Sequence, residues 1–106
     1  ADAVAGRKAE SAWIIYREAI ERGLVPEEIH GTIFWQIKSI MLAASSGSPV
    51  ESKLSPFVYM KAKSAAKNFS LVELSQFSNN LVSMYHDAHR GKNNFELELE
   101  KFLLTI

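Results

Sequence analysis

The chain lacks cysteine, a net charge and any long apolar run. Without cysteine it can hold no disulfide scaffold, no thiolate zinc site and no cysteine nucleophile. Twelve basic and twelve acidic residues balance, and residues 1–53 alone carry six basic and seven acidic side chains. No overall field therefore favours nucleic acid or a membrane surface. No apolar run is longer than the five residues of 40–44, which is far shorter than the roughly 18 residues of a membrane span.

Motifs of the common catalytic classes are also missing. The five glycines are scattered and none precedes a Lys-Ser or Lys-Thr pair, so no phosphate-binding loop is present. There is no Gly-x-Ser-x-Gly elbow for a nucleophilic serine. Paired carboxylates occur only as glutamates on predicted helix surfaces. We therefore expect a domain that is not an enzyme and that needs no cofactor and no small-molecule substrate.

The first residues, Ala-Asp-Ala-Val, lack the basic region and apolar stretch of a signal peptide. They also lack an initiator methionine, which favours an origin within a longer protein. Together with the absence of cysteine, this favours a cytoplasmic protein.

What the chain does contain is helical periodicity between clear break points. Its 106 residues, 47% of them hydrophobic, suit one domain over residues 1–106. Apolar stripes with start and stop signals predict helices over residues 8–22, 26–44, 56–68, 70–91 and 95–106. Residues 1–5 resemble the tail of a further helix, and residues 45–53 are predicted as a loop. The expected fold is all-α, a compact bundle of five main helices plus a short N-terminal helical remnant.

The last segment is ambiguous. Residues 95–100 alternate apolar and acidic residues with period two, which is typical of a strand. However, Glu, Leu and Lys are strong helix formers, and Phe95, Leu99, Phe102 and Ile106 form a helical stripe. A lone strand would also have no partner in this chain. We therefore predict a helix.

Two histidines provide the one cluster with metal-ligand residue types. His86 and His89 lie three apart, so both can face one side of a helix, whereas Asp87 points away from them. The favoured interpretation is a solvated polar face, and a metal-dependent hydrolase at this pair is the weakest of the alternatives.

Four lysines form a second candidate site. From residue 52 to residue 72 there is no acidic side chain, whereas Lys53, Lys61, Lys63 and Lys67 all fall inside. Such a patch contacts phosphates with salt-dependent affinity, so a stand-alone helical nucleic-acid-binding module remains an alternative. The expected absence of aromatic side chains on the lysine face, and of net positive charge, counts against it.

Apolar residues that leave the core stripe of their helices form the third candidate site. They are Ile14, Trp35, Leu42, Leu97 and Leu104. Exposed apolar side chains mark interfaces, and tryptophan is enriched where binding energy concentrates. Five helices enclose a limited interior, so some of these residues are expected on the surface. Trp35 and Leu42, on the central helix, are the ones we most expect to be buried within the chain.

Short motifs also follow one another in a fixed order along nearly the whole chain. In sequence they are Asp2-Ala3-Val4 with Gly6, Ala12-Trp13 with Tyr16 and Gly23, Pro26 to Ile29, Trp35-Gln36-Ile37-Lys38, Ser55-Pro56-Phe57-Val58 with Lys61, Phe69-Ser70 with Leu74, and Asp87 with Arg90-Gly91. In this order and spacing, the chain resembles the C-terminal domain of the delta subunit of bacterial DNA polymerase III, a clamp-loader subunit.

Three of these motifs are similar to motifs of the family, and in each one residue type is replaced. Residues 35–38 are similar to its Gln-x-Arg signature, with Lys38 in place of arginine. Residues 55–58 are similar to its His-Pro-Phe segment, with Ser55 in place of histidine. Asp87 to Gly91 is similar to its Asp-x-x-Lys-x-Gly, with Arg90 in place of lysine.

The resemblance implies a helical collar domain that packs beside the equivalent domains of the other clamp-loader subunits. It implies that the parent subunit binds and opens the sliding clamp, through N-terminal ATPase-like domains absent here, and acts on primer-template DNA within the complex. Delta subunits do not themselves hydrolyse ATP, so the implied role of this domain is assembly. The off-stripe apolar residues suit that role.

Overall fold

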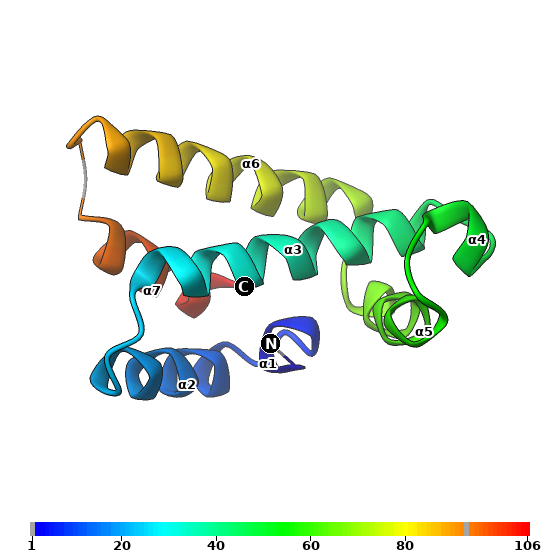
Figure 1. The fold of residues 1–106 in the computed structure, drawn as a ribbon, viewed down its shortest axis with the longest axis horizontal. Coiled ribbons are helices and arrows are strands. Elements are labelled where there is room, and N and C mark those ends of the chain that lie inside the picture. Colours follow the sequence, from blue (N-terminus) through cyan, green and yellow to red (C-terminus); the bar gives the residue numbers. More distant parts are fainter. Residues whose placement is uncertain (1, 93) are drawn as a thin grey trace.

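The computed structural model describes residues 2–92 and 94–106, and over these residues all of the regular secondary structure is helical (Figure 1). The elements are α1 (Asp2–Ala5), α2 (Ala9–Glu21), α3 (Pro26–Ala44), α4 (Pro49–Ser52), α5 (Pro56–Ala65), the 3₁₀ turn η1 (Ala66–Asn68), α6 (Leu71–His89) and α7 (Phe95–Thr105). The prediction of an all-α bundle with five main helices is confirmed. Residue 1 of the predicted N-terminal remnant and residue 93 of the last break lie outside the described residues.

The helix boundaries follow the capping signals in the sequence. Ser55 and Ser70 accept hydrogen bonds from the backbone N–H three residues on, and Ser70 and Glu73 form a complete capping box. Gly23 adopts a φ of 94°, the left-handed conformation that ends α2. Residues 95–105 are helical, so the strand alternative is excluded for that segment.

Two boundaries differ from the sequence prediction. Residues 49–52, predicted as loop, form the short helix α4, because Pro49 follows Ser48, whose side chain accepts from the N–H of Glu51. The helix predicted to reach residue 68 ends as an α-helix at Ala65 and tightens into η1. Such 3₁₀ turns are common at helix ends.

Helix α3 is the centre of the molecule. It packs on α6 along one side and on α5, α7 and η1 on others, and Figure 1 shows it running between α6 and the layer of α2, α1 and α5. Ile37, Ile40 and Ala43 on α3 are at most 1% exposed. With Leu74, Leu81, Leu99 and Leu103 they form the most deeply buried part of the core. The side of α3 that faces away from this core carries exposed residues, among them Trp35 and Leu42.

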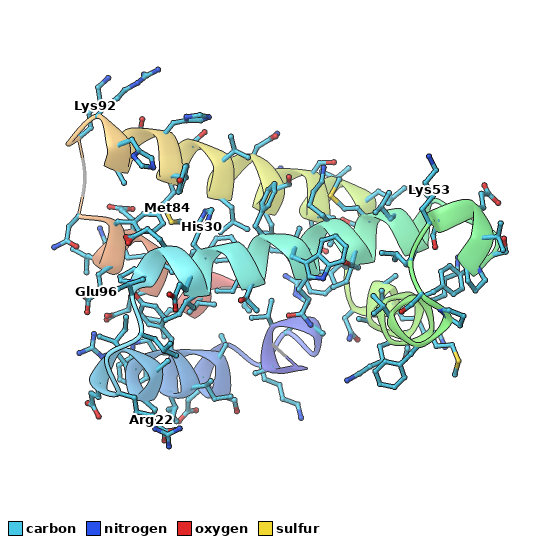
Figure 2. All side chains as sticks on the ribbon, viewed as in Figure 1. Arg22, His30, Lys53, Met84, Lys92 and Glu96 are labelled. Atoms are coloured by element: carbon cyan, nitrogen blue, oxygen red, sulfur yellow. The ribbon has the colours of Figure 1, made fainter. Side chains whose placement is uncertain are left out.

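A buried histidine joins α3 to α6. His30 is 7% exposed, and its Nε2 lies 2.8 Å from the carbonyl oxygen of Leu81. A carbonyl only accepts, so Nε2 carries the hydrogen and donates. The imidazole ring also lies within 6.3 Å, centroid to centroid, of the rings of Phe34, Tyr85 and Phe95. Figure 2 shows His30 in the space between the two helices.

A polar cluster fixes the first turn of the chain against the start of α6. Arg7, which has a φ of 56°, donates to the carbonyl of Asn68 at 3.1 Å and to the carboxylate of Glu73 at 2.8 Å. Its guanidinium lies 5.0 Å from the ring centre of Phe69. The backbone hydrogen bond from Ser70, and then the one from Arg7, lower the pKa of Glu73. This carboxylate therefore stabilises the fold above its ordinary pKa, and the contribution is lost as the pH falls.

At the other end of the molecule α2 packs on α7. The Tyr16 hydroxyl donates to the carbonyl of Glu96 at 2.9 Å, and Arg17 lies within 3.4 Å of the carboxylates of Glu96 and Glu100. The Tyr16 side chain is only 2% exposed. Burial, followed by the charge of Glu96, raises the pKa of Tyr16 to about 12.

The raised pKa of Tyr16 predicts a loss of stability in alkali. Unfolded tyrosine releases its proton near pH 10, whereas the native state holds it to about pH 12. The unfolded state then binds fewer protons, so the free energy of unfolding falls as the pH rises through this window. Urea unfolding between pH 9 and pH 12 measures this slope, and Tyr16→Phe should flatten it. An unchanged slope in that variant would contradict the assignment.

None of the helices in residues 2–92 and 94–106 combines the length and apolar character needed to cross a membrane.

Candidate interaction surface

All five predicted interface residues are exposed. Trp35 is 55% exposed, Leu42 41% and Ile14 43%, and Leu97 and Leu104 are similar. The expectation that Trp35 and Leu42 are buried within the chain is therefore wrong. The reason is that α5 meets α3 through its small residues and leaves this side of α3 uncovered. The five residues lie on three helices, α2, α3 and α7.

Sequence reasoning missed a further group of exposed apolar residues near α5. Its members, each more than half exposed, are Val50, Phe57, Met60, Leu71 and Val72. Phe57 and Met60 lie three apart on α5, outside the stripe that contains the buried Ala62 and Ala65. The off-stripe criterion applied to the other helices would have identified both. Together with Trp35, they add exposed apolar side chains on α3, α4, α5 and the start of α6.

Specific contacts hold α5 against the C-terminal half of α3. The buried Ala62 and Ala65 allow the two helix backbones to approach closely. The Tyr59 hydroxyl donates to the carbonyl of Ser46 at 3.2 Å. The ammonium of Lys63 donates to the carbonyls of Ala43 and Ser46, both at 3.0 Å. These carbonyls lie in the last turn of α3 and just beyond it, where backbone acceptors lack helical partners.

A groove of about 290 Å³ lies beside this contact. Its floor is α3, one wall is α5, and Ala5 at the end of α1 closes the opposite side. The full lining is Ala5, Thr32, Trp35, Gln36, Ser39, Ile40, Phe57, Val58, Lys61, Ala62 and Ala65. Trp35 with Gln36, and Phe57 with Val58 and Lys61, belong to two of the sequence motifs noted above. Segments about twenty residues apart in the sequence therefore meet on one concave surface.

Polar atoms in the groove lining lack partners. Gln36 Oε1 and Ser39 Oγ are buried, and neither makes a hydrogen bond to any of the described residues. An unsatisfied buried polar atom costs about 1–3 kcal/mol. A ligand that supplies a hydrogen-bond donor beside Gln36 would remove part of this cost.

The structure divides the four lysines of the predicted phosphate patch. Lys63 is engaged by the two carbonyls at the end of α3, so its ammonium serves the fold and is a poor candidate for a phosphate contact. Lys53 lies beyond α4 with a φ of 64°, and Lys67 lies on η1. Lys61 faces the groove, where its ammonium lies 5.5 Å from the ring centre of Phe57. The expectation of a lysine face without aromatic side chains is therefore wrong.

The charges of this neutral chain are segregated in space. Residues 29–72, which include most of α3 and all of α4, α5 and η1, carry five lysines and a single acidic residue, Glu51. Residues 1–28 carry four basic and six acidic residues, and residues 73–106 carry three and five. Figure 1 shows α4 and α5 together at one end, away from α2 and α7. The groove therefore lies at the basic end of the molecule.

The histidine pair lies at the far end of α6. His86 and His89 are exposed, and the ring of His89 lies 4.3 Å from that of Tyr85, centroid to centroid. Within residues 2–92 and 94–106, no three His, Asp or Glu side chains come together as a metal site requires.

Removing both imidazoles, His86→Ala with His89→Ala, is expected to change the free energy of unfolding by less than about 1 kcal/mol. Both side chains are exposed, and their favourable effect on the helix dipole at the end of α6 is small. Thermal melting of the double variant measures this. A loss of several kcal/mol, or stoichiometric zinc in the purified wild-type protein, would show that the pair has a structural or metal-binding role.

No protein-family model, no curated protein and no solved structure matches this chain.

Proposed function

We propose that this chain is a non-catalytic collar domain from the delta subunit of a bacterial DNA polymerase III clamp loader. In this role it holds its subunit in a hetero-oligomeric ring with the other clamp-loader subunits. The assembled complex loads the sliding clamp onto primer-template DNA during replication.

The observation that carries the proposal is the convergence of two motifs on one surface. The residues that resemble the family's Gln-x-Arg and His-Pro-Phe segments lie on α3 and α5 and line the same groove. A domain whose role is assembly needs apolar surface outside its own core. This chain exposes such residues on α2, α3, α5 and α7, and its all-α architecture suits the side-by-side packing of similar helical domains.

The direct test is reconstitution of the complete subunit with the other clamp-loader subunits. Co-purification and sedimentation show whether a complex forms and whether it requires residues 1–106. The proposal fails if the subunit without these residues assembles as well as the complete one.

Ile14→Asp is expected to separate assembly from stability. Ile14 is 43% exposed on α2, so the change should lower the free energy of unfolding by only about 0.5 kcal/mol. An interface anchor contributes about 2 kcal/mol or more, so assembly of the complete subunit should weaken by roughly thirtyfold. Thermal melting and co-purification are measured on the same preparations.

Val82→Asp is the matched control for Ile14→Asp, because it places the same charge at a similarly exposed β-branched residue, 39% exposed on α6. It should leave assembly unchanged. If Ile14→Asp melts far below the wild type, Ile14 belongs to the core. If assembly is unaffected, the interface lies elsewhere.

One observation favours a second candidate, binding of nucleic acid. Lys61 lies over the exposed ring of Phe57, and Trp35 lines the same groove, which combines lysine with aromatic side chains as single-strand binding sites do. A titration with single-stranded and double-stranded DNA over a range of salt concentrations tests it. Binding that weakens steeply with salt, and that is lost in Lys61→Ala with Lys67→Ala, would favour this function.

A further inference from the structure

We propose that the groove between α3 and α5 receives a helix of a neighbouring protein whose contacting stripe is aliphatic and whose flanks carry aspartate or glutamate. The inference rests on the proposed function only because it assumes that the helix belongs to an adjoining clamp-loader subunit. It adds the place of docking and the chemistry of the segment that docks.

The lining of the groove favours an aliphatic helix. Most of its surface belongs to apolar side chains, with Ile40, Val58, Ala62 and Ala65 beside the large exposed ring of Trp35. Grooves of this kind accept the apolar face of an amphipathic helix through anchors at positions i, i+3 or i+4, and i+7. A volume of about 290 Å³ holds a few such anchors and is small for a cofactor.

The charges around the groove favour acidic flanks. Lys61 lies in the lining itself, and the segment that builds the floor and the α5 wall carries five lysines against one glutamate. Glu51 is engaged by the backbone N–H of Gly47, which donates to its carboxylate at 3.1 Å. The lysines of this segment attract a helix with carboxylates beside its apolar stripe and repel one with lysines there.

The same surface is less suited to a nucleic acid strand. Lys63, one of four candidate phosphate contacts, is bonded to two backbone carbonyls. The groove floor is aliphatic, which suits leucine side chains better than planar bases.

The test uses two synthetic helical peptides of about 15 residues, long enough to form helix when bound. Both carry leucines at i, i+3 and i+7. The first has glutamates beside this stripe, and the second has lysines at the same positions. Fluorescence anisotropy of the labelled peptides measures binding to the 106-residue chain, and a labelled single-stranded oligonucleotide is titrated in parallel.

Four variants locate the binding site. Trp35→Ala removes the exposed ring in the groove, and Lys61→Glu reverses the charge on its wall. Lys92→Glu, at the opposite end of the molecule (Figure 2), and Val82→Ala on α6 are the matched controls for charge and for apolar surface. Circular dichroism melting shows that each variant is folded.

The expected result is binding of the acidic peptide alone, weakened about tenfold or more by Trp35→Ala and by Lys61→Glu. Lys61→Glu should also gain affinity for the basic peptide, and both controls should bind as the wild type does. The inference is overturned if neither peptide binds at about 100 μM. It is also overturned if the two peptides bind alike, if the control variants lose as much affinity, or if only the oligonucleotide binds in the groove.

The proposed function fails separately. If the acidic peptide binds in the groove but the complete subunit does not assemble with other clamp-loader subunits, the collar role is wrong and the groove inference stands. If assembly occurs and is indifferent to Trp35→Ala and Lys61→Glu, the collar role stands and the natural occupant of the groove is not a neighbouring subunit.

Discussion

Ile37→Ala is expected to lower the free energy of unfolding by about 3 kcal/mol, the largest effect that we anticipate for a single substitution. Ile37 lies at the middle of α3 and is completely buried. Deleting its side chain beyond Cβ removes apolar contacts and leaves a cavity that the surrounding helices fill only in part. Helices α5, α6 and α7 all pack on α3. A cavity in the middle of α3 therefore weakens the packing of several helices at once.

Urea unfolding monitored by circular dichroism measures the change in stability. Ile15→Ala makes the same chemical change on α2 at a side chain that is 51% exposed, and it should cost about 1 kcal/mol or less. Equal losses for the two variants would mean that α3 is not the centre of the core.

His30→Ala is expected to have the second largest effect, a loss of about 2–3 kcal/mol. The substitution empties the space between Phe34, Tyr85 and Phe95 and removes the donor to the carbonyl of Leu81. Loss of a buried ring and loss of a buried hydrogen bond both contribute. The same unfolding measurement applies.

His86→Ala is the matched control, because it removes the same ring from an exposed position on α6. It should change the free energy of unfolding by about 0.5 kcal/mol or less. His30→Phe keeps a ring and removes the hydrogen bond, so an intermediate loss of about 1 kcal/mol is expected. If His30→Ala were as stable as His86→Ala, the packing of α3 on α6 would be independent of this side chain.

The helices were predictable because their signals are local. Pro26, the capping box of Ser70 and Glu73, and the left-handed Gly23 act within a few residues, and the structure begins or ends its helices at these positions. The final helix was predictable because propensity and the 3.6-residue stripe of Phe95, Leu99 and Phe102 agree, although the period-two alternation competes with them.

The candidate surface was only partly predictable, because exposure depends on which neighbour covers each face of a helix. The pattern of α3 shows that Trp35 opposes the core stripe, but it does not show that α5 contacts α3 through alanines and leaves Trp35 uncovered. The role of Lys63 depends on carbonyls 20 and 17 residues away, in the last turn of α3 and just beyond it. The counts of charged residues in the two halves of the sequence are nearly equal, because the basic segment, residues 29–72, extends over the midpoint of the chain. The segregation of charge was therefore not visible in those counts.

The peripheral position of α5 has a consequence for the dynamics of the groove. This helix is ten residues long and its buried residues are the small Ala62 and Ala65, whereas α6 buries the larger side chains of Leu74, Leu81 and Met84. Segments with few buried contacts open by local fluctuations that require less free energy than global unfolding. The amides of α5 should therefore exchange with solvent faster than those of α6. A partner helix that binds only when α5 is packed on α3 stabilises this packed state and slows the exchange. The protection of each α5 amide would therefore report whether the groove is occupied.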